Sequence, residues 1–224
     1  MSKYRLILID TLILCMVSTV LAVVFNFTVD KLKGEVKKDD PIVIAIIQAD
    51  AKEVEKLVQM GAGVTNETDE LGRTALMRAA FANYFETRPA PRDAPATILR
   101  QTDDKRVAMV GMLVEHGARL DTRDRDGWSA LMWASWSGLT EVAAKLLDLG
   151  ASPEFADRQG HTALIIAARR GNAEIVEALL AKGADPAVRN RAGESALDAA
   201  RAGMAQYPDN ASGFTAIIAR LALH

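Results

Sequence analysis

The chain has 224 residues, of which 50% are apolar, so it is long enough to bury a sizeable hydrophobic core. Its 27 Lys and Arg nearly balance its 29 Asp and Glu, and a protein without a basic excess is a poor candidate for binding nucleic acid. The single cysteine, Cys15, excludes an internal disulfide and a cysteine-based metal site.

A membrane anchor is predicted near the start of the sequence. Residues 11–29 carry no charge, and as a helix rising about 1.5 Å per residue they match the roughly 30 Å hydrocarbon core of a bilayer. Because the apolar run is longer than that of a removable signal peptide, we expect an uncleaved transmembrane helix over residues 6–29. A short basic tail over residues 1–5 precedes this helix, and a charged linker over residues 30–40 follows it.

The two ends of the predicted helix give opposing signals about its orientation. The basic residues of the linker outnumber those of the tail, which favours the cytoplasmic side for the domain that follows. A basic tail before an apolar run is, however, how a signal anchor begins, and a long domain behind such an anchor is usually translocated. We therefore expect the domain on the periplasmic side of a bacterial inner membrane.

Asp10 is the only acidic residue of this predicted helix. An ionisable group in a membrane helix costs free energy unless it is paired or hydrated, and it is therefore a functional candidate. Two interpretations stay open. Asp10 reaches the interface beside Arg5 and caps the helix, or it pairs with, or handles protons for, a partner membrane protein.

Residues 41–224 contain an internal repeat with a period of 33 residues. The recurring positions are Gly127, Gly160 and Gly193; Ser129, Thr162 and Ser195; and Gly117, Gly150 and Gly183. Within a period, apolar residues recur at helical spacing in two runs separated by a glycine such as Gly138, which predicts two antiparallel helices. Because one such pair cannot bury both its apolar faces alone, we expect successive pairs to stack.

This chain resembles the ankyrin-repeat family in the segments GRTALMRAAFAN, GWSALMWASWSGLTEVAAKLLDLGAS and GHTALIIAARRGNAEIVEALLAKGAD. With its predicted anchor it looks like a membrane-anchored, bacterial-type ankyrin-repeat protein. The resemblance implies an all-α solenoid of about five helix–turn–helix repeats with β-hairpin-like turns. Where the family pattern has a histidine, this chain has Met77, Met132 and Ile165, and we expect packing of these side chains to replace the missing hydrogen bonds.

Two insertions are predicted inside this ankyrin-repeat domain, near residues 84–105 and 204–213. The first contains Pro89, Pro91 and Pro95, which favours a loop over an extension of a helix. The second lies in the fifth repeat, before a last helix expected over residues 214–223.

Catalytic and metal-binding patterns are absent from the sequence. Gly127-Trp128-Ser129 begins like a nucleophile elbow but lacks its second glycine, and the repeat register already explains the serine. The histidines, His116, His161 and His224, have no ligand spacing. We therefore predict that the protein is not an enzyme and binds no cofactor, metal, small-molecule substrate or nucleic acid.

The resemblance assigns partner binding to the hairpin tips and to the concave side of the first helices. The matching positions are Arg73, Phe81, Arg125, Trp128, Trp136, Arg158, His161, Arg169, Arg170, Arg191 and Arg201. Arg125, Arg158 and Arg191 recur at one position, so they predict a basic ladder with steps of about 10 Å. Because Trp and Arg are enriched at binding hot spots and Arg suits carboxylates, we expect a protein partner with an acidic surface.

A competing interpretation is that these arginines pair with acidic residues of the domain itself, on a solvated surface. The candidate partners are Asp124, Asp126, Asp157 and Glu194. Trp133, one helical step further inward, is expected in the core.

Two functions follow from these predictions. The first is a membrane-tethered protein–protein interaction scaffold, or an accessory subunit of a membrane complex. The alternative is a transmembrane subunit whose helix, through Asp10, pairs with or handles protons for a partner membrane protein.

Overall fold

A computed structural model of the chain describes residues 41–48, 50–60, 66, 68–81 and 96–223. All of them belong to the second of the chain's two units, Asp40–His224. The predicted basic tail, membrane helix, Asp10 and linker lie outside the described residues and stay predictions. Within the described ranges, no helix combines the length and the apolar character needed to cross a bilayer.

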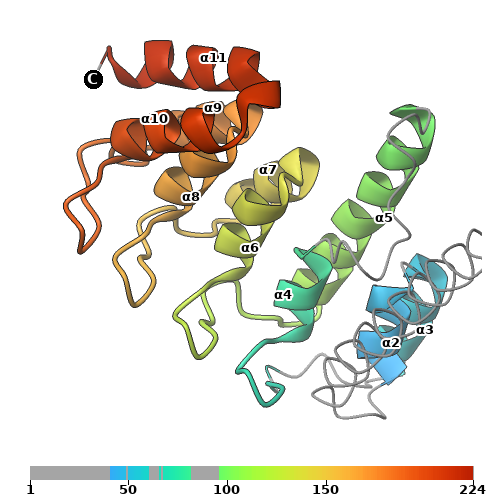
Figure 1. Cartoon of the computed structure of the whole chain (residues 1–224). Coiled ribbons are helices and arrows are strands. Elements are labelled where there is room, and N and C mark those ends of the chain that lie inside the picture. Colours follow the sequence, from blue (N-terminus) through green and yellow to red (C-terminus); the bar gives the residue numbers. More distant parts are fainter. Residues whose placement is uncertain (1–40, 49, 61–65, 67, 82–95, 224) are drawn as a thin grey trace, which may run out of the picture. The chain divides into compact units, whose positions relative to one another are not determined.

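The described part of the second unit consists of helices arranged in five successive pairs (Figure 1). The pairs are α2 (Pro41–Ile47) with α3 (Ala51–Gln59), α4 (Ala75–Ala79) with α5 (Ala96–Glu115), α6 (Ala130–Ser137) with α7 (Thr140–Asp148), α8 (Ala163–Arg170) with α9 (Ala173–Ala181), and α10 (Ala196–Gln206) with α11 (Ala211–Leu221). A short 3₁₀ helix, η1 (Pro208–Asn210), joins the last two. The described residues form no named strand, so the predicted all-α architecture is confirmed for them.

A hydroxyl side chain begins the first helix of each of the last four repeats. Thr74, Ser129, Thr162 and Ser195 are the N-cap residues of α4, α6, α8 and α10, and each accepts a hydrogen bond from the backbone N–H three residues further on. Such a cap satisfies one of the free N–H groups of a helix start and is worth about 1 kcal/mol. The recurring Ser or Thr of the 33-residue period is therefore structural, as predicted.

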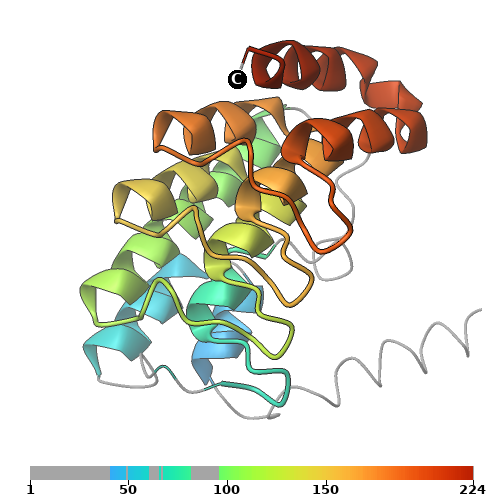
Figure 2. The ribbon, with the colours of Figure 1, turned by 90° about the vertical axis from the view of Figure 1, so that its left-hand side faces the viewer.

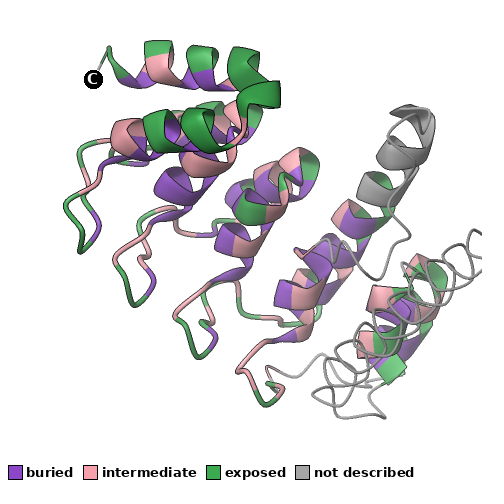
Figure 3. Ribbon diagram, in the orientation of Figure 1, coloured by how far each residue is buried: buried purple, intermediate pink, exposed green. Residues whose placement is uncertain are grey.

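The helices stack in two rows. First helices α2, α4, α6, α8 and α10 pack on one another in order, and second helices α3, α5, α7, α9 and α11 do the same beside them (Figure 2). Small side chains such as Ala134 and Ala167, both fully buried, let neighbouring first helices approach closely. Leu146 and Leu179 fill the space between second helices, so that one continuous core runs through the described repeats (Figure 3).

Met77, Met132 and Ile165 lie in this core with 1% of each residue exposed. They stand where the family pattern has histidine, and the prediction that they pack as apolar side chains is confirmed. The hairpin loops that precede α4, α6, α8 and α10 all project from the same side of the first helices, away from the second row (Figure 1).

The prediction that residues 84–105 form a loop is wrong for its last ten positions. Helix α5 begins at Ala96 and continues to Glu115, so the inserted residues after Pro95 lengthen this helix. All three prolines precede Ala96, and no proline or glycine follows until Gly111, so nothing stops the helix there. Residues 82–95 lie outside the described residues.

Most residues of the second predicted insertion are helical. Helix α10 runs on to Gln206, and α11 begins at Ala211 instead of at Phe214. Residues 204–206 are Met, Ala and Gln, which favour a helix, while Pro208 lacks a backbone N–H and opens the 3₁₀ turn between the two helices.

Candidate functional site

A side chain at one recurrent position shapes each of the four hairpin loops. The Oδ1 atom of Asp157 accepts the backbone N–H groups of Gln159 and His161, each at 2.8 Å. Asp69, Asp124 and Asn190 make the same two bonds in their own hairpins. Because both bonds close the turn around one oxygen, the tip of each hairpin is held in a defined shape.

The second oxygen of each aspartate bonds a different side chain. Oδ2 of Asp69 accepts from Arg73 at 2.9 Å and from Arg78 at 2.7 Å. Oδ2 of Asp157 lies 3.0 Å from Nδ1 of His161. Arg73 and His161, both predicted to bind a partner, therefore direct their polar groups to the aspartate of their own hairpin.

Trp133 makes the corresponding bond in the third repeat, where its indole N–H donates to Oδ2 of Asp124 at 3.0 Å. The residue is half-buried and packs against the core. The prediction of a core position for Trp133 therefore holds for its packing. Its indole N–H also binds the hairpin aspartate, a role that was not predicted from the sequence.

Asp69 is stabilised in its charged form. Burial alone would raise the pKa of this carboxyl, but the backbone N–H of Arg73 and the positive charges of Arg73 and Arg78 outweigh burial. The pKa of Asp69 consequently lies below its ordinary value of 3.8.

Backbone hydrogen bonds join each hairpin to the next. The N–H of Arg125 donates to the carbonyl of Leu71 at 2.9 Å, that of Arg158 to Asp126 at 3.1 Å, and that of Arg191 to Gln159 at 2.8 Å. Gly127 permits this close approach, because a Cβ atom there would lie 3.1 Å from the backbone nitrogen of Arg158. The tips are thus held in register from repeat to repeat.

Three arginines stand at equivalent places on the joined tips, and we call Arg125, Arg158 and Arg191 the arginine row. All three are exposed, and none forms an ion pair with a described residue. Three of the four acidic side chains considered as internal partners are used otherwise: Asp124 and Asp157 by their hairpins, and Glu194 by Arg169 and Asn190. The fourth, Asp126, is exposed and forms no ion pair with a described residue. In the described part of the chain, the row leaves its guanidinium groups facing solvent.

A second feature crosses the repeats along the first helices and the residues that flank them, and we call it the aromatic stripe. Its members, each in contact with the next, are Phe81, Trp133, Trp128, Trp136, Arg170 and Tyr207. Ring centroids of its aromatic pairs lie 4.7 to 5.7 Å apart, and the guanidinium of Arg170 lies between the rings of Trp136 and Tyr207. The stripe links four repeats through partly exposed side chains.

The end of the stripe at the fifth repeat is fixed by polar contacts. Arg170 donates to the hydroxyl of Tyr207 at 2.8 Å and to the carbonyl of Trp136 at 3.3 Å. An open pocket of about 380 Å³ adjoins this contact. Its lining residues are Arg170, Gln206, Tyr207, Pro208, Asp209 and Asn210. Tyr207 was not predicted as a site residue, since it lies in the inserted segment and outside the repeat register.

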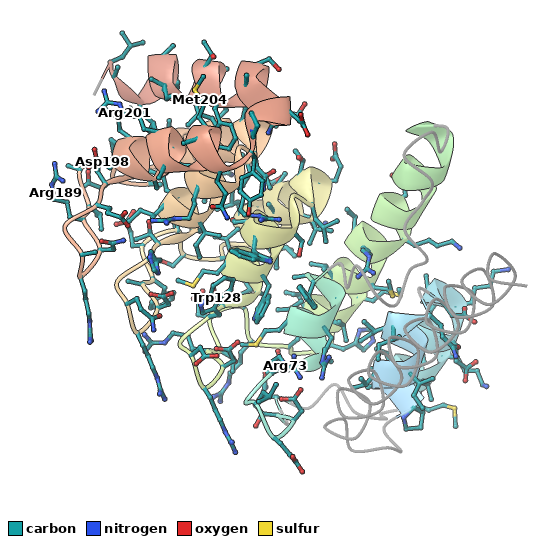
Figure 4. The ribbon with its side chains drawn as sticks, viewed as in Figure 1. Arg73, Trp128, Arg189, Asp198, Arg201 and Met204 are labelled. Atoms are coloured by element: carbon teal, nitrogen blue, oxygen red, sulfur yellow. The ribbon has the colours of Figure 1, made fainter. Side chains whose placement is uncertain are left out.

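The remaining predicted site residues form pairs within the domain. Arg169 pairs with Glu194, whose pKa is held below its usual range by a hydrogen bond from Asn190 and by the charge of Arg169. Arg201 lies 3.9 Å from Asp198, on the same edge of the fifth repeat as Arg189 (Figure 4). The described residues contain no group of three His, Cys, Asp or Glu side chains placed to hold a metal ion.

Two comparisons bear on this surface. A family model described as "Ankyrin repeat" matches residues 126–158 and 159–191, which cover most of the third and fourth repeats. No curated protein matches the chain. The matched segments contain Arg158 and Arg191 of the arginine row and most of the aromatic stripe's members.

Proposed function

Because this chain is an ankyrin-repeat protein, we propose that it is a membrane-tethered scaffold, or an accessory subunit of a membrane complex, that holds a partner protein. Ankyrin repeats are modules of protein–protein interaction and typically carry no catalytic activity. The observation that carries the proposal is the aromatic stripe, which crosses four repeats on the face of the first helices.

The stripe has the composition and the rigidity of a binding surface. Trp, Tyr and Arg dominate the energetics of protein interfaces, and Trp136 has 38% of its surface exposed. Because each member already packs against the next, burying the stripe under a partner orders few additional rotamers. Core packing alone does not require a guanidinium between two aromatic rings at the surface.

The arginine row indicates which charge the proposed partner carries on its binding surface. Its three guanidinium groups are exposed and make no ion pair with the described residues, so they are available to carboxylates of another protein. Arg binds a carboxylate through two parallel N–H bonds, and opposite charges speed the encounter of two proteins. An acidic partner surface fits both properties.

Membrane attachment is part of the proposal and rests on the sequence. The predicted helix over residues 6–29 would fix the repeat domain close to a bacterial inner membrane through a linker of about ten residues, on the periplasmic side. So short a tether raises the effective concentration of the domain for neighbours in the same membrane. A subunit of a membrane complex is therefore the partner we favour.

Co-purification tests the interaction. The tagged full-length chain would be isolated in mild detergent and its associated proteins identified by mass spectrometry. Trp136→Ala combined with Arg158→Ala is expected to lose the partner, while Arg119→Ala, which removes an exposed arginine outside both features, should keep it. Retention of the partner by the double variant, with all three proteins equally folded by circular dichroism, would rule out the proposed surface.

Two further measurements test the membrane part. Extraction of cell membranes with alkaline carbonate should leave the full chain in the pellet, and release into the supernatant would exclude a spanning helix. Reporter fusions at the C-terminus would show on which side the domain lies. Asp10→Asn separates the alternative function: loss of the complex's activity with assembly intact would favour proton handling, and a silent substitution would remove that idea.

A further inference from the structure

The row of hairpin tips continues beyond the arginines into the second repeat. The carbonyl that accepts the backbone N–H of each arginine belongs to the second tip residue of the preceding hairpin: Leu71, Asp126 and Gln159. Glu70 directly precedes Leu71, as Arg125 precedes Asp126, and so occupies the arginine position of its own hairpin. It is exposed and pairs with no described basic side chain. From the second repeat to the fifth, the row therefore carries one acidic side chain followed by three basic ones.

The spacing of the row limits the shape of what it can bind. Stacked helices lie about 8–10 Å apart, and because the joined tips belong to successive stacked repeats, we expect the row to advance by about the same step. In a polyproline II chain every third residue returns to the same face after about 9.3 Å. An α-helix returns to the same face after seven residues, about 10.5 Å, and residues three apart in a β-strand point to opposite faces. The polyproline II period fits the step most closely.

The width of the row points the same way. Asp126 is exposed directly beside Arg125, at the neighbouring tip position. An acidic helix, about 10–12 Å across, would cover both residues and bring its carboxylates against Asp126. A single extended chain is narrow enough to follow the arginines alone, so repulsion by Asp126 favours the extended form.

We infer that the row of Glu70, Arg125, Arg158 and Arg191 binds an extended segment of the partner that carries an acidic side chain at every third residue and a basic one at the end over Glu70. The inference rests on the proposed function, because it names the chemistry and the register of the partner segment. Three carboxylates then face three guanidinium groups, and the fourth position of the row admits only the opposite charge.

Fluorescence anisotropy of the full-length chain with labelled peptides tests the inference. The first peptide, rich in proline and alanine, has three glutamates at successive third positions and a lysine at the next. A second has the same composition with its glutamates adjacent, and a third replaces the lysine with glutamate. We expect the first peptide to bind more tightly than either of the others by about tenfold, with a difference that shrinks as salt is added.

Charge reversals in the protein test the register. Arg158→Glu should weaken binding of the first peptide about tenfold, whereas Arg119→Glu, an exposed arginine outside the row, should leave binding unchanged. Glu70→Lys should reverse the preference, so that the peptide with four glutamates becomes the tighter ligand. Equal binding of the three peptides, or an unchanged preference in Glu70→Lys, would overturn the inference.

The outcomes separate this inference from the proposed function. One outcome is that the double variant Trp136→Ala and Arg158→Ala loses its co-purified partner while the unaltered chain binds the three peptides equally. In that case the proposed interaction surface is supported, and the inferred spacing of charges in the partner segment is wrong. If the peptide with adjacent glutamates binds as tightly as the first, the spacing of one acidic side chain at every third residue is wrong. Peptide binding with the expected order, in a chain that co-purifies nothing, would support the row and overturn the scaffold function.

Discussion

The guanidinium carbon of Arg170 lies 4.4 Å from the ring centroid of Trp136. Arg170 ends α8, and Trp136 is in the last turn of α6, so this contact joins the fourth repeat to the third near the C-terminal ends of their first helices. It places a charge and a large aromatic ring together at the surface, where the aromatic stripe reaches its polar end.

Replacing Arg170 should weaken both the stripe and the stack of repeats. Arg170→Ala removes a cation–π contact with each of two rings and a hydrogen bond to Tyr207, and we expect the free energy of unfolding to fall by about 1 kcal/mol. Urea unfolding followed by tryptophan fluorescence measures the change. Arg119→Ala is the control, and equal stability of the two variants would contradict the role assigned to Arg170.

Ser135 should be replaceable with a gain in stability. Its hydroxyl is fully buried in α6 and has no hydrogen-bond partner among the described residues, while the equivalent positions of two neighbouring repeats hold Ala80 and Ala168. Because an unpaired buried hydroxyl carries a desolvation penalty, Ser135→Ala should raise the free energy of unfolding by about 1 kcal/mol.

Replacing Ser129, in the same region, should instead lower the stability of the protein. Ser129 caps α6 by accepting the backbone N–H of Met132, so Ser129→Ala should lower the free energy of unfolding by about 1 kcal/mol. Thermal melting of both variants beside the unaltered chain checks the pair. A loss of stability in Ser135→Ala would mean that its hydroxyl has a partner that the described residues do not contain.

Close stacking of the hairpins should make Gly160 harder to replace than Gly150. Both have positive φ angles, 83° and 97°, so alanine is strained at either position. A Cβ atom at Gly160 would also lie 3.1 Å from the backbone nitrogen of Arg191, whereas one at Gly150 meets nothing within 4 Å. We expect Gly160→Ala to cost about 1 kcal/mol more than Gly150→Ala in chemical denaturation, and equal costs would exclude the steric contribution.

Acid should remove the stabilisation that Asp69 provides. The pKa of this carboxyl is lower in the folded chain than its ordinary value of 3.8, so its contribution is complete above pH 3.8 and is lost as pH falls through the folded pKa. Asn cannot carry the charge, and Asp69→Asn should therefore melt at a lower temperature than the unaltered chain at neutral pH. The difference between the two melting temperatures should narrow below pH 3.8, and a difference that stays constant would refute the linkage.

The repeat period was sufficient to predict the paired helices, a structural role for the recurring Ser and Thr, and the common position of Arg125, Arg158 and Arg191. These features depend on residues close together in the sequence or one period apart, which a single sequence displays directly. The insertions were harder to interpret, because proline marks where a helix cannot continue but says little about where the next one begins. For this reason the first ten residues of α5 were predicted as loop.

Several side-chain contacts, both within a repeat and between repeats, could not be predicted in the same way. Trp133 binds Asp124 through its indole, and Tyr207 reaches Arg170 from a segment without a counterpart in other repeats. Such contacts depend on side-chain directions and on helix lengths that vary between repeats. His161 and Arg73 match the family's binding positions, but their polar groups bond the aspartates of their own hairpins.

The hydrogen bonds that join neighbouring tips run between main-chain atoms only. Substitution of an exposed tip side chain such as that of Arg158 therefore leaves the connection between the loops intact. In a lineage of related proteins, the charges along this edge can change one loop at a time without a cost in folding. The charge pattern of this edge can thus change separately from the fold that displays it.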